Sequence, residues 1–283
     1  MKAHKLPAII IPVHNAADEL NACLASLRRN TPADAEILLI DDASDDPSIQ
    51  PMLYRWLADA GPLWRLAVLP QNIGFVGAVN HGMEITQGDV VLLNSDTVLT
   101  PGWLEGLQHC LASDAAIATV TPWTNNGEIV SLPDFCRSNP LPGNADGVAR
   151  IIAATGTPTY PEIPTAVGFC MAISRAALDQ LGLFDQQLFG LGYGEENDFC
   201  MRAHAAGWKN VLCDNVYVGH VGGSSFAPRG IGPDVSSMAK LLSRHPGYLD
   251  AIQGFIAADP LSPRRNELVA ALRKAGVIGP GLA

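Results

Sequence analysis

The chain has 283 residues, 48% of them hydrophobic and 16% charged, which predicts a globular protein with one large α/β domain or two small ones. It has 18 basic and 28 acidic residues, so its formal net charge is -10. This negative charge disfavours nucleic acid and anionic lipid as partners. If the ligand is anionic, a cation is expected to mediate its binding. No apolar run reaches the roughly 18 residues that span a bilayer, so any association with the inner face of the cell membrane is expected to be peripheral.

Strand-like and helix-like segments alternate up to residue 122. The apolar runs predict strands at residues 8–13, 35–40, 65–69, 88–93 and 116–122. Helices are expected between them, the first capped by Asn15 with Asp18, and the others at residues 47–60, 73–86 and 101–113. This alternation predicts a mostly parallel sheet with helices on both faces, whose ligands bind at the carboxyl ends of the strands.

The pattern changes at residue 123. Residues 123–165 are rich in Asn, Gly and Pro with one expected helix at 145–154, and a loop excursion of this length is usually functional or mobile. Order resumes with an apolar segment, a helix, an acidic segment and a strand, and after Gly230 come two or three amphipathic helices. The six cysteines form no CxxC pair, so we expect a reducing cytoplasm with neither a disulfide framework nor a zinc site.

Three of the expected strands end in polar motifs, which are PVHN (12–15), IDDASDD (40–46) and NSDT (94–97). Each alone is compatible with an ordinary turn or helix cap, because Asn, Asp and Ser favour both. Together, carboxylates on one edge of a sheet repel one another unless a cation or hydrogen-bond donors lie among them. A hard divalent cation with oxygen ligands fits this edge, and such cations commonly bind phosphates.

The chain lacks the glycine-rich phosphate loops of dinucleotide-binding and P-loop folds. No GxGxxG follows the first expected strand, and no GxxxxGK[ST] motif occurs anywhere in the chain. Any phosphate group is therefore held by other means.

Eight stretches, in order over residues 8–226, resemble a family 2 glycosyltransferase of the GT-A fold. They are IIIPVHNAADELNACLASL, LLIDDASDD, NIGFVGAVNHGM, VVLLNSDTVLTPGWL, VGFCMAISRAAL, LGLFD, GYGEENDFCMRAHAAGW and VYVGHVGGSSF. The resemblance implies an α/β, Rossmann-like, mostly parallel sheet and inverting transfer from a nucleotide-diphosphate sugar (UDP, dTDP or GDP) to a glycan or lipid-linked hydroxyl. It also implies Mg²⁺ or Mn²⁺ as cofactor. Within the family, the chain resembles bacterial, rhamnosyltransferase-like enzymes of O-antigen and related surface polysaccharide biosynthesis.

The resemblance also divides the chain. Residues 1–230 are expected to form the GT-A domain, with a nucleotide-sugar-binding half at 1–122 and an acceptor and catalytic half at 123–230. Residues 231–283 are expected to form a C-terminal helical extension.

The resemblance implies a nucleotide-sugar site in the first half. Asp42 matches the family acid that contacts the base and ribose, and Asp41 lies beside it. Gly74 permits close backbone approach at the start of a helix, whose amino end favours negative charge, although simple capping stays an alternative. The remaining residues of this expected site are Pro12, His14, Asn15, Asn72, Asn80, Asn94, Ser95 and Asp96.

For the metal, the resemblance implies Asp96 as the last acid of a D-x-D element that binds Mg²⁺ or Mn²⁺. Asn94 occupies the first position of that element, which leaves fewer anionic ligands. His220 is expected to complete the metal site or to contact the diphosphate, with a structural role as the alternative.

For catalysis, the resemblance places the general base among Glu195, Glu196 and Asp198. The second acid of the family pattern corresponds to Glu196, where most relatives have Asp. Adjacent helical residues point roughly 100° apart, so only one of the glutamates is expected to face the sugar. Arg202 is an expected partner of Asp198 on the same helix.

Two other functions are compatible with parts of this pattern. A sugar nucleotidyltransferase uses a related sheet, but it needs a glycine-rich and basic loop after the first strand, which PVHNAAD lacks. A catalytically degenerate nucleotide-sugar-binding module is compatible with Asn94 in place of Asp and with Glu at the base position.

Overall fold

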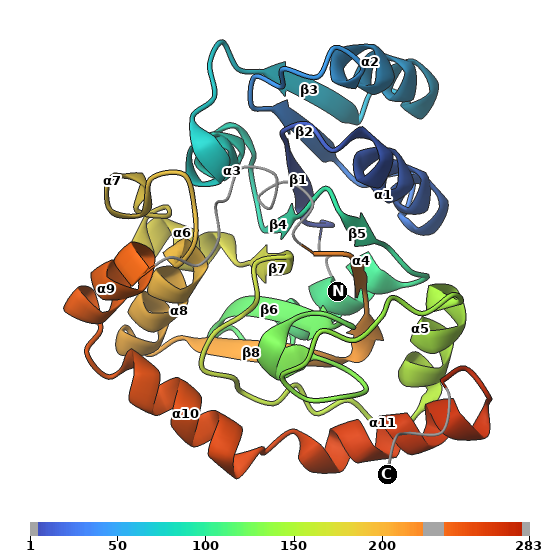
Figure 1. The fold of residues 1–283 in the computed structure, drawn as a ribbon, viewed down its shortest axis with the longest axis vertical. Helices are drawn as coiled ribbons and strands as arrows, with labels where there is room; N and C mark the ends of the chain where they lie inside the picture. Colours follow the sequence, from blue (N-terminus) through green and yellow to red (C-terminus); the bar gives the residue numbers. More distant parts are fainter. Residues whose placement is uncertain (1–4, 223–234, 279–283) are drawn as a thin grey trace.

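The computed structural model describes residues 5–222 and 235–278. Its centre is a seven-stranded sheet in the order β3-β2-β1-β4-β7-β6-β8, in which only β7 runs antiparallel to its neighbours (Figure 1). The strands are β1 (Ala8–Val13), β2 (Ile37–Asp41), β3 (Trp64–Val68), β4 (Val90–Leu93), β6 (Ile117–Trp123), β7 (Cys170–Ile173) and β8 (Lys209–Tyr217). The predicted α/β class with a mostly parallel sheet is confirmed.

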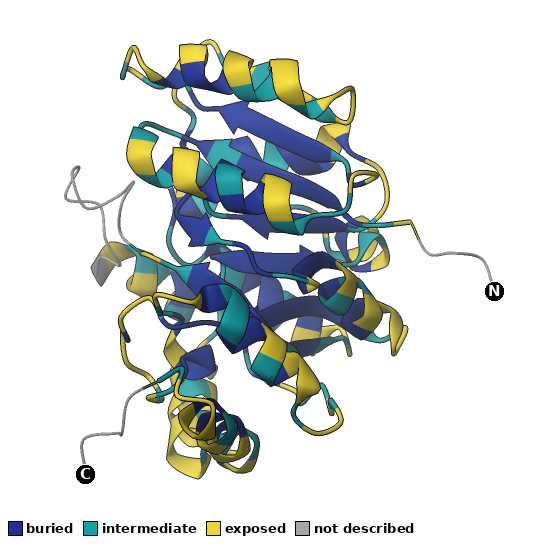
Figure 2. Ribbon diagram, turned by 90° about the vertical axis from the view of Figure 1, so that its right-hand side faces the viewer, coloured by how far each residue is buried: buried dark blue, intermediate teal, exposed yellow. Residues whose placement is uncertain are grey.

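Helices cover both faces of the sheet; most strand residues are buried, and the exposed residues lie mainly on the helices and loops (Figure 2). They are α1 (Ala17–Asn30), α2 (Ile49–Ala60), α3 (Gly74–Ile85), α4 (Trp103–Ala112), α5 (Ala145–Ala154), α6 (Arg175–Leu181), α7 (Gln186–Phe189) and α8 (Glu195–Ala205). In β1, Ile9 and Ile11 pack into one core cluster and Ile10 into the other. The unbroken apolar run of β1 thus follows from burial on both faces.

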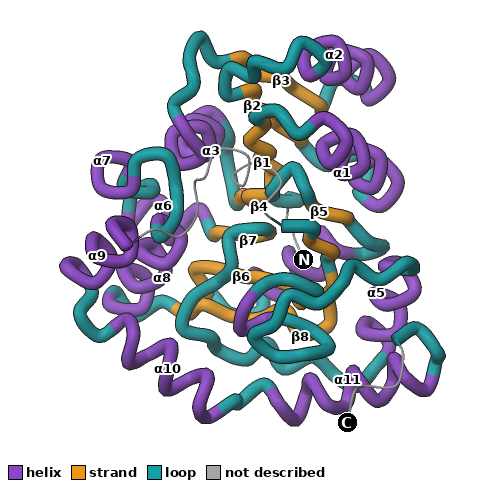
Figure 3. The backbone as a smooth tube through the Cα atoms, in the orientation of Figure 1, coloured by secondary structure: helices purple, strands orange, loops and turns teal. Residues whose placement is uncertain are grey.

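Three further helices form the C-terminal extension, which are α9 (Val235–Arg244), α10 (Tyr248–Ala258) and α11 (Ser262–Lys274). The first contacts α7 and the last contacts α5, so the extension runs along one side of the molecule (Figure 3). Residues 231–234 and 279–283 of the expected extension, and residues 223–226 of the last family-like stretch, lie outside the described residues. Within the described ranges, no helix combines the length and apolarity needed to cross a bilayer.

The start of α1 differs from the prediction. Its N-cap is Ala16, and no side chain caps it, so the expected cap by Asn15 and Asp18 is wrong. Asn15 and Ala16 both have left-handed backbones, with φ of 59° and 56°. This turn directs the Asn15 side chain to the loop after β2, where its Oδ1 accepts hydrogen bonds from the amides of Asp45 and Asp46.

A small second sheet was not predicted. β5 (Thr97–Val98) follows β4 directly and pairs antiparallel with β9 (Gly219–His220). The pairing sets Thr97 opposite His220, so it joins two parts of the chain that are far apart in sequence.

Candidate active site

The polar strand ends lie together at one edge of the sheet, as predicted. β2, β1 and β4 are adjacent and parallel, so the residues after each of them share the carboxyl edge. β1 pairs with β4 only from Ala8 to Ile10, and Pro12, which has no N–H to donate, lies beyond the end of that ladder opposite Ile40 of β2. Pro12 is thus placed in the strand whose end carries His14 and Asn15.

Four predicted nucleotide-sugar residues form one hydrogen-bonded group. His14 Nδ1 donates to the Asp42 carbonyl oxygen at 3.0 Å, which leaves Nε2 to accept from Asn15 Nδ2 at 3.1 Å. Asn72 Nδ2 lies 3.2 Å from the same carbonyl oxygen. These bonds tie together the loops that follow β1, β2 and β3.

The Asp42 carboxylate is buried and binds the start of α3. Its Oδ1 accepts from the amide of Ile73 at 2.7 Å and its Oδ2 from the amide of Gly74 at 2.9 Å. Gly74 has φ of 81°, and a Cβ there would lie 2.7 Å from the Leu191 Cα, so the position requires glycine. The negative charge at this helix amino end is supplied by the protein itself, which agrees with the capping alternative.

Two other predicted residues of this site hold the local backbone. Asp41 is buried, and its carboxylate accepts from the amide of Ser44 at 2.9 Å and from Gln50 Nε2 at 3.2 Å. Asn80 binds both backbone groups of Phe184, donating at 2.9 Å and accepting at 3.1 Å. Both ends of its amide are therefore used between α3 and the segment before α7, away from the other predicted ligands.

The end of β4 brings the two predicted metal ligands together. Asn94 is half-buried, Ser95 and Asp96 are buried, and β5 begins immediately after them. Because β5 pairs with β9, His220 Nε2 lies 3.5 Å from Asp96 Oδ1.

The surroundings of His220 fix its ring. Its Nδ1 donates to the Asn126 carbonyl oxygen at 2.7 Å, so the lone pair of Nε2 faces Asp96. The Asn125 side chain accepts from the His220 amide and donates to its carbonyl, each at 2.9 Å, and the ring stacks on Phe169 with centroids 5.0 Å apart.

This pair fits a divalent cation. A lone pair and a carboxylate that face each other repel unless a cation or proton lies between them. Two neighbouring ligands of an octahedral Mg²⁺ or Mn²⁺ lie about 3 Å apart, close to the observed separation of Asp96 and His220. The Asn126 carbonyl is the kind of outer partner that orients a metal-ligating histidine. No cluster of three or more His, Cys, Asp or Glu side chains suited to a metal occurs within residues 5–222 and 235–278, so the remaining ligands have to come from elsewhere.

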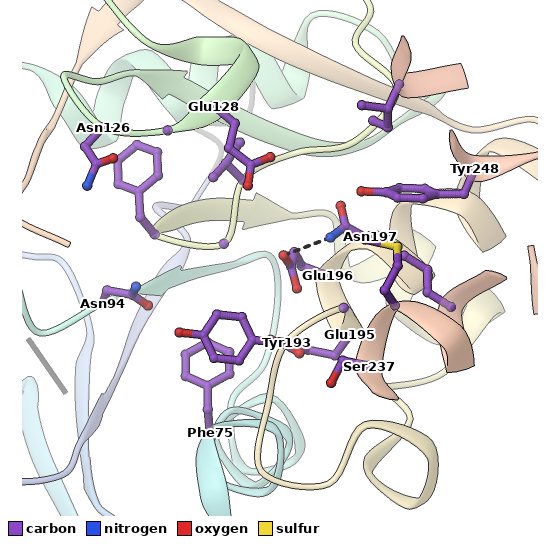
Figure 4. A pocket seen from close by; sticks show the side chains of 18 of the residues that line it. Phe75, Asn94, Asn126, Glu128, Tyr193, Glu195, Glu196, Asn197, Ser237 and Tyr248 are labelled. Carbon is purple, nitrogen blue, oxygen red and sulfur yellow. Dashed lines mark hydrogen bonds between the residues drawn. The ribbon is translucent and has the colours of Figure 1, made fainter. Parts of the chain in front are cut away.

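A cavity of about 460 Å³ opens beside Asn94 and His220. Its walls come from α3, the strand ends, the turn at 126–128, the segment 167–169, the start of α8 and the helices α9 and α10 (Figure 4). The residues that line the cavity include Asn94, Asn126, Glu128, Tyr193, Glu195, Glu196, His220, Met238, Tyr248, Leu249 and Ile252.

Glu195 and Glu196 both line this cavity at the first turn of α8. Glu195 is 4% exposed and its Oε2 has no hydrogen-bond partner, whereas Glu196 is half-buried and accepts from Asn197 Nδ2 at 3.1 Å. Burial raises the pKa of both carboxyls, and it raises that of Glu195 well above its ordinary value, with the charge of Glu196 as the next cause. The protonated form of Glu195 and the ionised form of Glu196 therefore favour each other.

Asp198 does not line the cavity. It is fully buried, and its carboxylate contacts Arg202 at 2.9 Å, Arg244 at 3.1 Å and His245 at 2.8 Å. The expected pair with Arg202 is confirmed. Through Arg244 and His245, Asp198 anchors the end of α9 and the turn before α10 to α8, and those two helices form one wall of the cavity.

Several cavity residues were not predicted. Glu128 lies in the 3-10 turn at Glu128–Val130, within the excursion whose composition suggested a functional loop but no particular residue. Tyr193 also lines the cavity, and burial and the charges of Glu195, Glu196 and Asp96 raise its pKa. Tyr193 lies in the family-like stretch GYGEENDFCMRAHAAGW, whose acids drew the prediction, whereas no periodicity or motif distinguishes Glu128.

Known proteins with a similar sequence are glycosyltransferases. Polypeptide N-acetylgalactosaminyltransferase 6 from Bos taurus is 28% identical over 239 residues, which cover 76% of this chain and 38% of that protein. The O-antigen biosynthesis protein RfbC from Myxococcus xanthus is 26% identical over 245 residues, covering 85% of this chain and 18% of that protein. The chain thus spans well under half the length of these relatives.

Solved structures agree on the fold. GalNAc-T7 with UDP, GalNAc and Mn²⁺ superposes with a TM-score of 0.64 at 17% identity, covering 91% of this chain and 58% of that one. The mannosyltransferase PcManGT from Pyrobaculum calidifontis, with GDP-Man and Mn²⁺, gives a TM-score of 0.56 at 15% identity, covering 99% and 77%. The family model described as glycosyl transferase family 2 matches residues 8–182, more than half of the chain. The GT-A architecture of the described residues and this match agree: the chain belongs to glycosyl transferase family 2.

Proposed function

We propose that this chain transfers a sugar, with inversion at the anomeric carbon, from a nucleotide-diphosphate sugar to a hydroxyl of a glycan or lipid-linked acceptor. The observation that carries the proposal is one cavity that joins Asn94 and His220 of the candidate cation site to the carboxylate of Glu196. An electrophilic donor and a base are the two components that sugar transfer to a hydroxyl requires.

In this mechanism Glu196 takes the proton of the attacking hydroxyl. A sugar hydroxyl is a poor nucleophile, and a carboxylate with a raised pKa is a stronger base at neutral pH than an ordinary one. Burial supplies that raised pKa, and the protonated neighbour Glu195 leaves Glu196 as the ionised member of the pair. Attack from the side opposite the nucleotide inverts the anomeric carbon.

The donor diphosphate would bind next to Asp96 and His220. A bound Mg²⁺ or Mn²⁺ would offset the negative charge that accumulates on the leaving diphosphate. The group formed by His14, Asn15, Asp42 and Asn72 at the neighbouring strand ends is the proposed position of base and ribose. UDP, dTDP and GDP remain the candidate nucleotides; the two structural neighbours bind UDP and GDP-Man.

Asp198 acts in this proposal through the wall of the cavity rather than as a base, because its carboxylate is occupied by three basic side chains. The acceptor would lie against α9 and α10, which form the wall on the far side of Glu196 from Asn94 (Figure 4). A role in O-antigen-like polysaccharide assembly and a place at the cytoplasmic face of the membrane are part of the proposal. The location is tested by fractionating cells that produce the chain.

The direct experiment has two stages. A thermal-shift screen of UDP, GDP, dTDP and CDP, with and without Mn²⁺, identifies the nucleotide, because ligand binding raises the apparent stability by mass action. The matching nucleotide sugars are then incubated with the protein, and the released nucleotide and the anomeric configuration of the product are measured. Metal-dependent release with inversion supports the proposal, and retention of configuration contradicts the inverting mechanism.

The same assays separate the rivals. Formation of a nucleotide sugar from labelled nucleoside triphosphate and sugar phosphate indicates a nucleotidyltransferase. Nucleotide binding without hydrolysis or transfer of any donor indicates a degenerate binding module.

A further inference from the structure

One carboxylate in the cavity has no role in the mechanism above. Glu128 lines the cavity, and its side chain is exposed to that space. Within the described ranges its carboxylate makes no hydrogen bond or ion pair with another residue. In Figure 4, Glu128, Glu196 and Tyr248 point from three different elements into the same space.

The backbone at Glu128 has a strained conformation. Its φ of 51° is left-handed, a conformation that side chains other than Gly, Asn and Asp rarely adopt. Two hydrogen bonds hold the turn in place: the Gly127 amide donates to Ser131 Oγ, and the Cys136 amide donates to the Glu128 carbonyl. A strained backbone held by a buried framework often marks a functional position.

Tyr248 of α10 lines the same space as Glu128 and Glu196. Burial and then the charges of these two carboxylates raise the pKa of Tyr248, so its hydroxyl stays protonated. Glu195, which lines the same cavity, has a buried Oε2 without a hydrogen-bond partner, and such an atom calls for a donor from a ligand. Hydroxyl groups of a sugar are donors of this kind.

The charge and polarity of the walls restrict that ligand. No Lys or Arg occurs among the described residues that line the cavity, whereas three glutamates do. An anionic group on this side of the cavity would meet the like charge of the described glutamates. Met238, Leu249 and Ile252 provide an apolar wall on the side of α9 and α10, which suits an apolar group attached to the sugar.

We propose, building on the function above, that Glu128 determines acceptor specificity. It accepts a hydrogen bond from a hydroxyl next to the one that is attacked, and it selects an uncharged glycoside whose apolar substituent packs on α9 and α10. The sugar is bound between Glu128, Glu196 and Tyr248, with the attacking hydroxyl at Glu196.

The test uses synthetic acceptors with the donor found for the wild type and Mn²⁺. The probes are p-nitrophenyl glycosides of neutral hexoses and p-nitrophenyl glucuronide, which adds one carboxylate. Glu128→Gln keeps an accepting oxygen but removes its charge, so it should raise the acceptor KM by about 5-fold or more, the scale of the difference between a charged and a neutral acceptor, while the donor KM changes by less than about 2-fold. Glu128→Lys should shift the preference from neutral glycosides toward the glucuronide.

Two further variants keep the result interpretable. Asparagine adopts the left-handed conformation but is too short to reach the same hydroxyl, so Glu128→Asn should retain the wild-type Tm and still show the raised acceptor KM. Glu162→Gln, an acid that pairs with Lys209 away from the cavity, should match the wild type in both.

An unchanged acceptor KM in Glu128→Gln overturns the proposal, as does a fall in kcat alone, which would make Glu128 a base. A wild type that hydrolyses a donor but neither uses nor binds a neutral glycoside overturns the acceptor class. A wild type that neither transfers nor hydrolyses any donor refutes the proposed function itself, and this inference with it.

Discussion

At the ends of β1, β2 and β4 the site residues follow their strands within three positions, whereas on the other side of the cavity they come from loops and from helices of distant sequence. The first region is built by local pattern: an apolar strand ends, polar residues follow, and neighbouring strands bring those residues to one edge. The second region is built by long-range packing, in which a left-handed turn carries Glu128 and the helices α9 and α10 form the wall.

The two regions also differ in the chemical groups that they present to a ligand. The strand-end region presents backbone amides, amide side chains and the Asp96–His220 pair, groups that suit a donor common to a large family. The second region presents carboxylates and an apolar wall. Glu128 lies within the residues 8–182 that match the family model, whereas Glu195, Glu196 and the helices α9 and α10 lie outside them. We therefore expect substitutions in the first region to change donor and metal binding, and substitutions in the second to change proton transfer and acceptor choice.

The largest expected effect is at the metal pair of the first region. Asp96→Ala should abolish the Mn²⁺-dependent part of the nucleotide thermal shift and lower transfer by about 10³-fold, because several kcal/mol of leaving-group stabilisation are lost. His220→Ala should weaken the same shift less severely. Circular dichroism should show an unchanged fold for both. If Asp96→Ala keeps a Mn²⁺-dependent shift, the metal assignment is wrong.

The next effect belongs to the second region. Glu196→Gln should lower kcat by about 10²-fold or more while donor binding survives, the usual scale for a general base. The acid limb of the wild-type pH profile should lie above the ordinary range of a glutamate, since burial raises this pKa and the base acts only when ionised. That limb should vanish in the variant.

The matched control is Glu195→Gln, whose kcat should fall much less. The reverse ranking would move the base by one residue. Two mild variants would return attention to other acids of the cavity.

The sequence predicted the first region well for a physical reason. His14, Asn15, Asp42 and Asn72 meet because each follows a strand, and strand order in a parallel sheet brings those ends together. Asp96 and His220 were assigned from the family resemblance, and the short β5–β9 pairing that joins them carries no local signal.

Two residues show what a pattern cannot predict. Asn80 and Asp198 have side chains suited to ligand binding, but the structure commits one to the backbone of Phe184 and the other to three basic side chains. Residue type alone does not determine which neighbour takes a hydrogen bond. Glu128 shows the converse, because its place depends on a turn fixed by a buried network rather than on any periodicity.

A smaller effect is expected where the first region binds the nucleotide. Asp42→Ala should weaken nucleotide binding about 10-fold with or without Mn²⁺, because it removes the carboxylate that holds the amides of Ile73 and Gly74. Asp46→Ala is the control, since among the described residues the carboxylate of half-buried Asp46 bonds to Ser48 alone, and its amide bond to Asn15 does not depend on the side chain. Isothermal titration gives both affinities. Loss of the metal-dependent part alone would contradict the separate positions proposed for base and cation.

The smallest effect is on stability and concerns Glu195. Burial raises the pKa of Glu195 well above the ordinary value of a glutamate, so between these two pKa values the folded state binds more protons than the unfolded state. The free energy of unfolding must then fall as pH rises through this window, because folding opposes ionisation of a buried carboxyl. Glutamine cannot ionise, so Glu195→Gln should lose less stability than the wild type on going from about pH 5 to about pH 9.

A difference of about 1 kcal/mol in the free energy of unfolding corresponds to about 2–4 °C in the Tm of a domain of roughly 200 residues, which calorimetry resolves. Glu162→Gln, with its carboxylate largely exposed, should follow the wild type. Parallel curves for Glu195→Gln and the wild type would mean that Glu195 is ionised in the folded protein, and Glu196 would then lose the protonated neighbour on which its role as the ionised base depends.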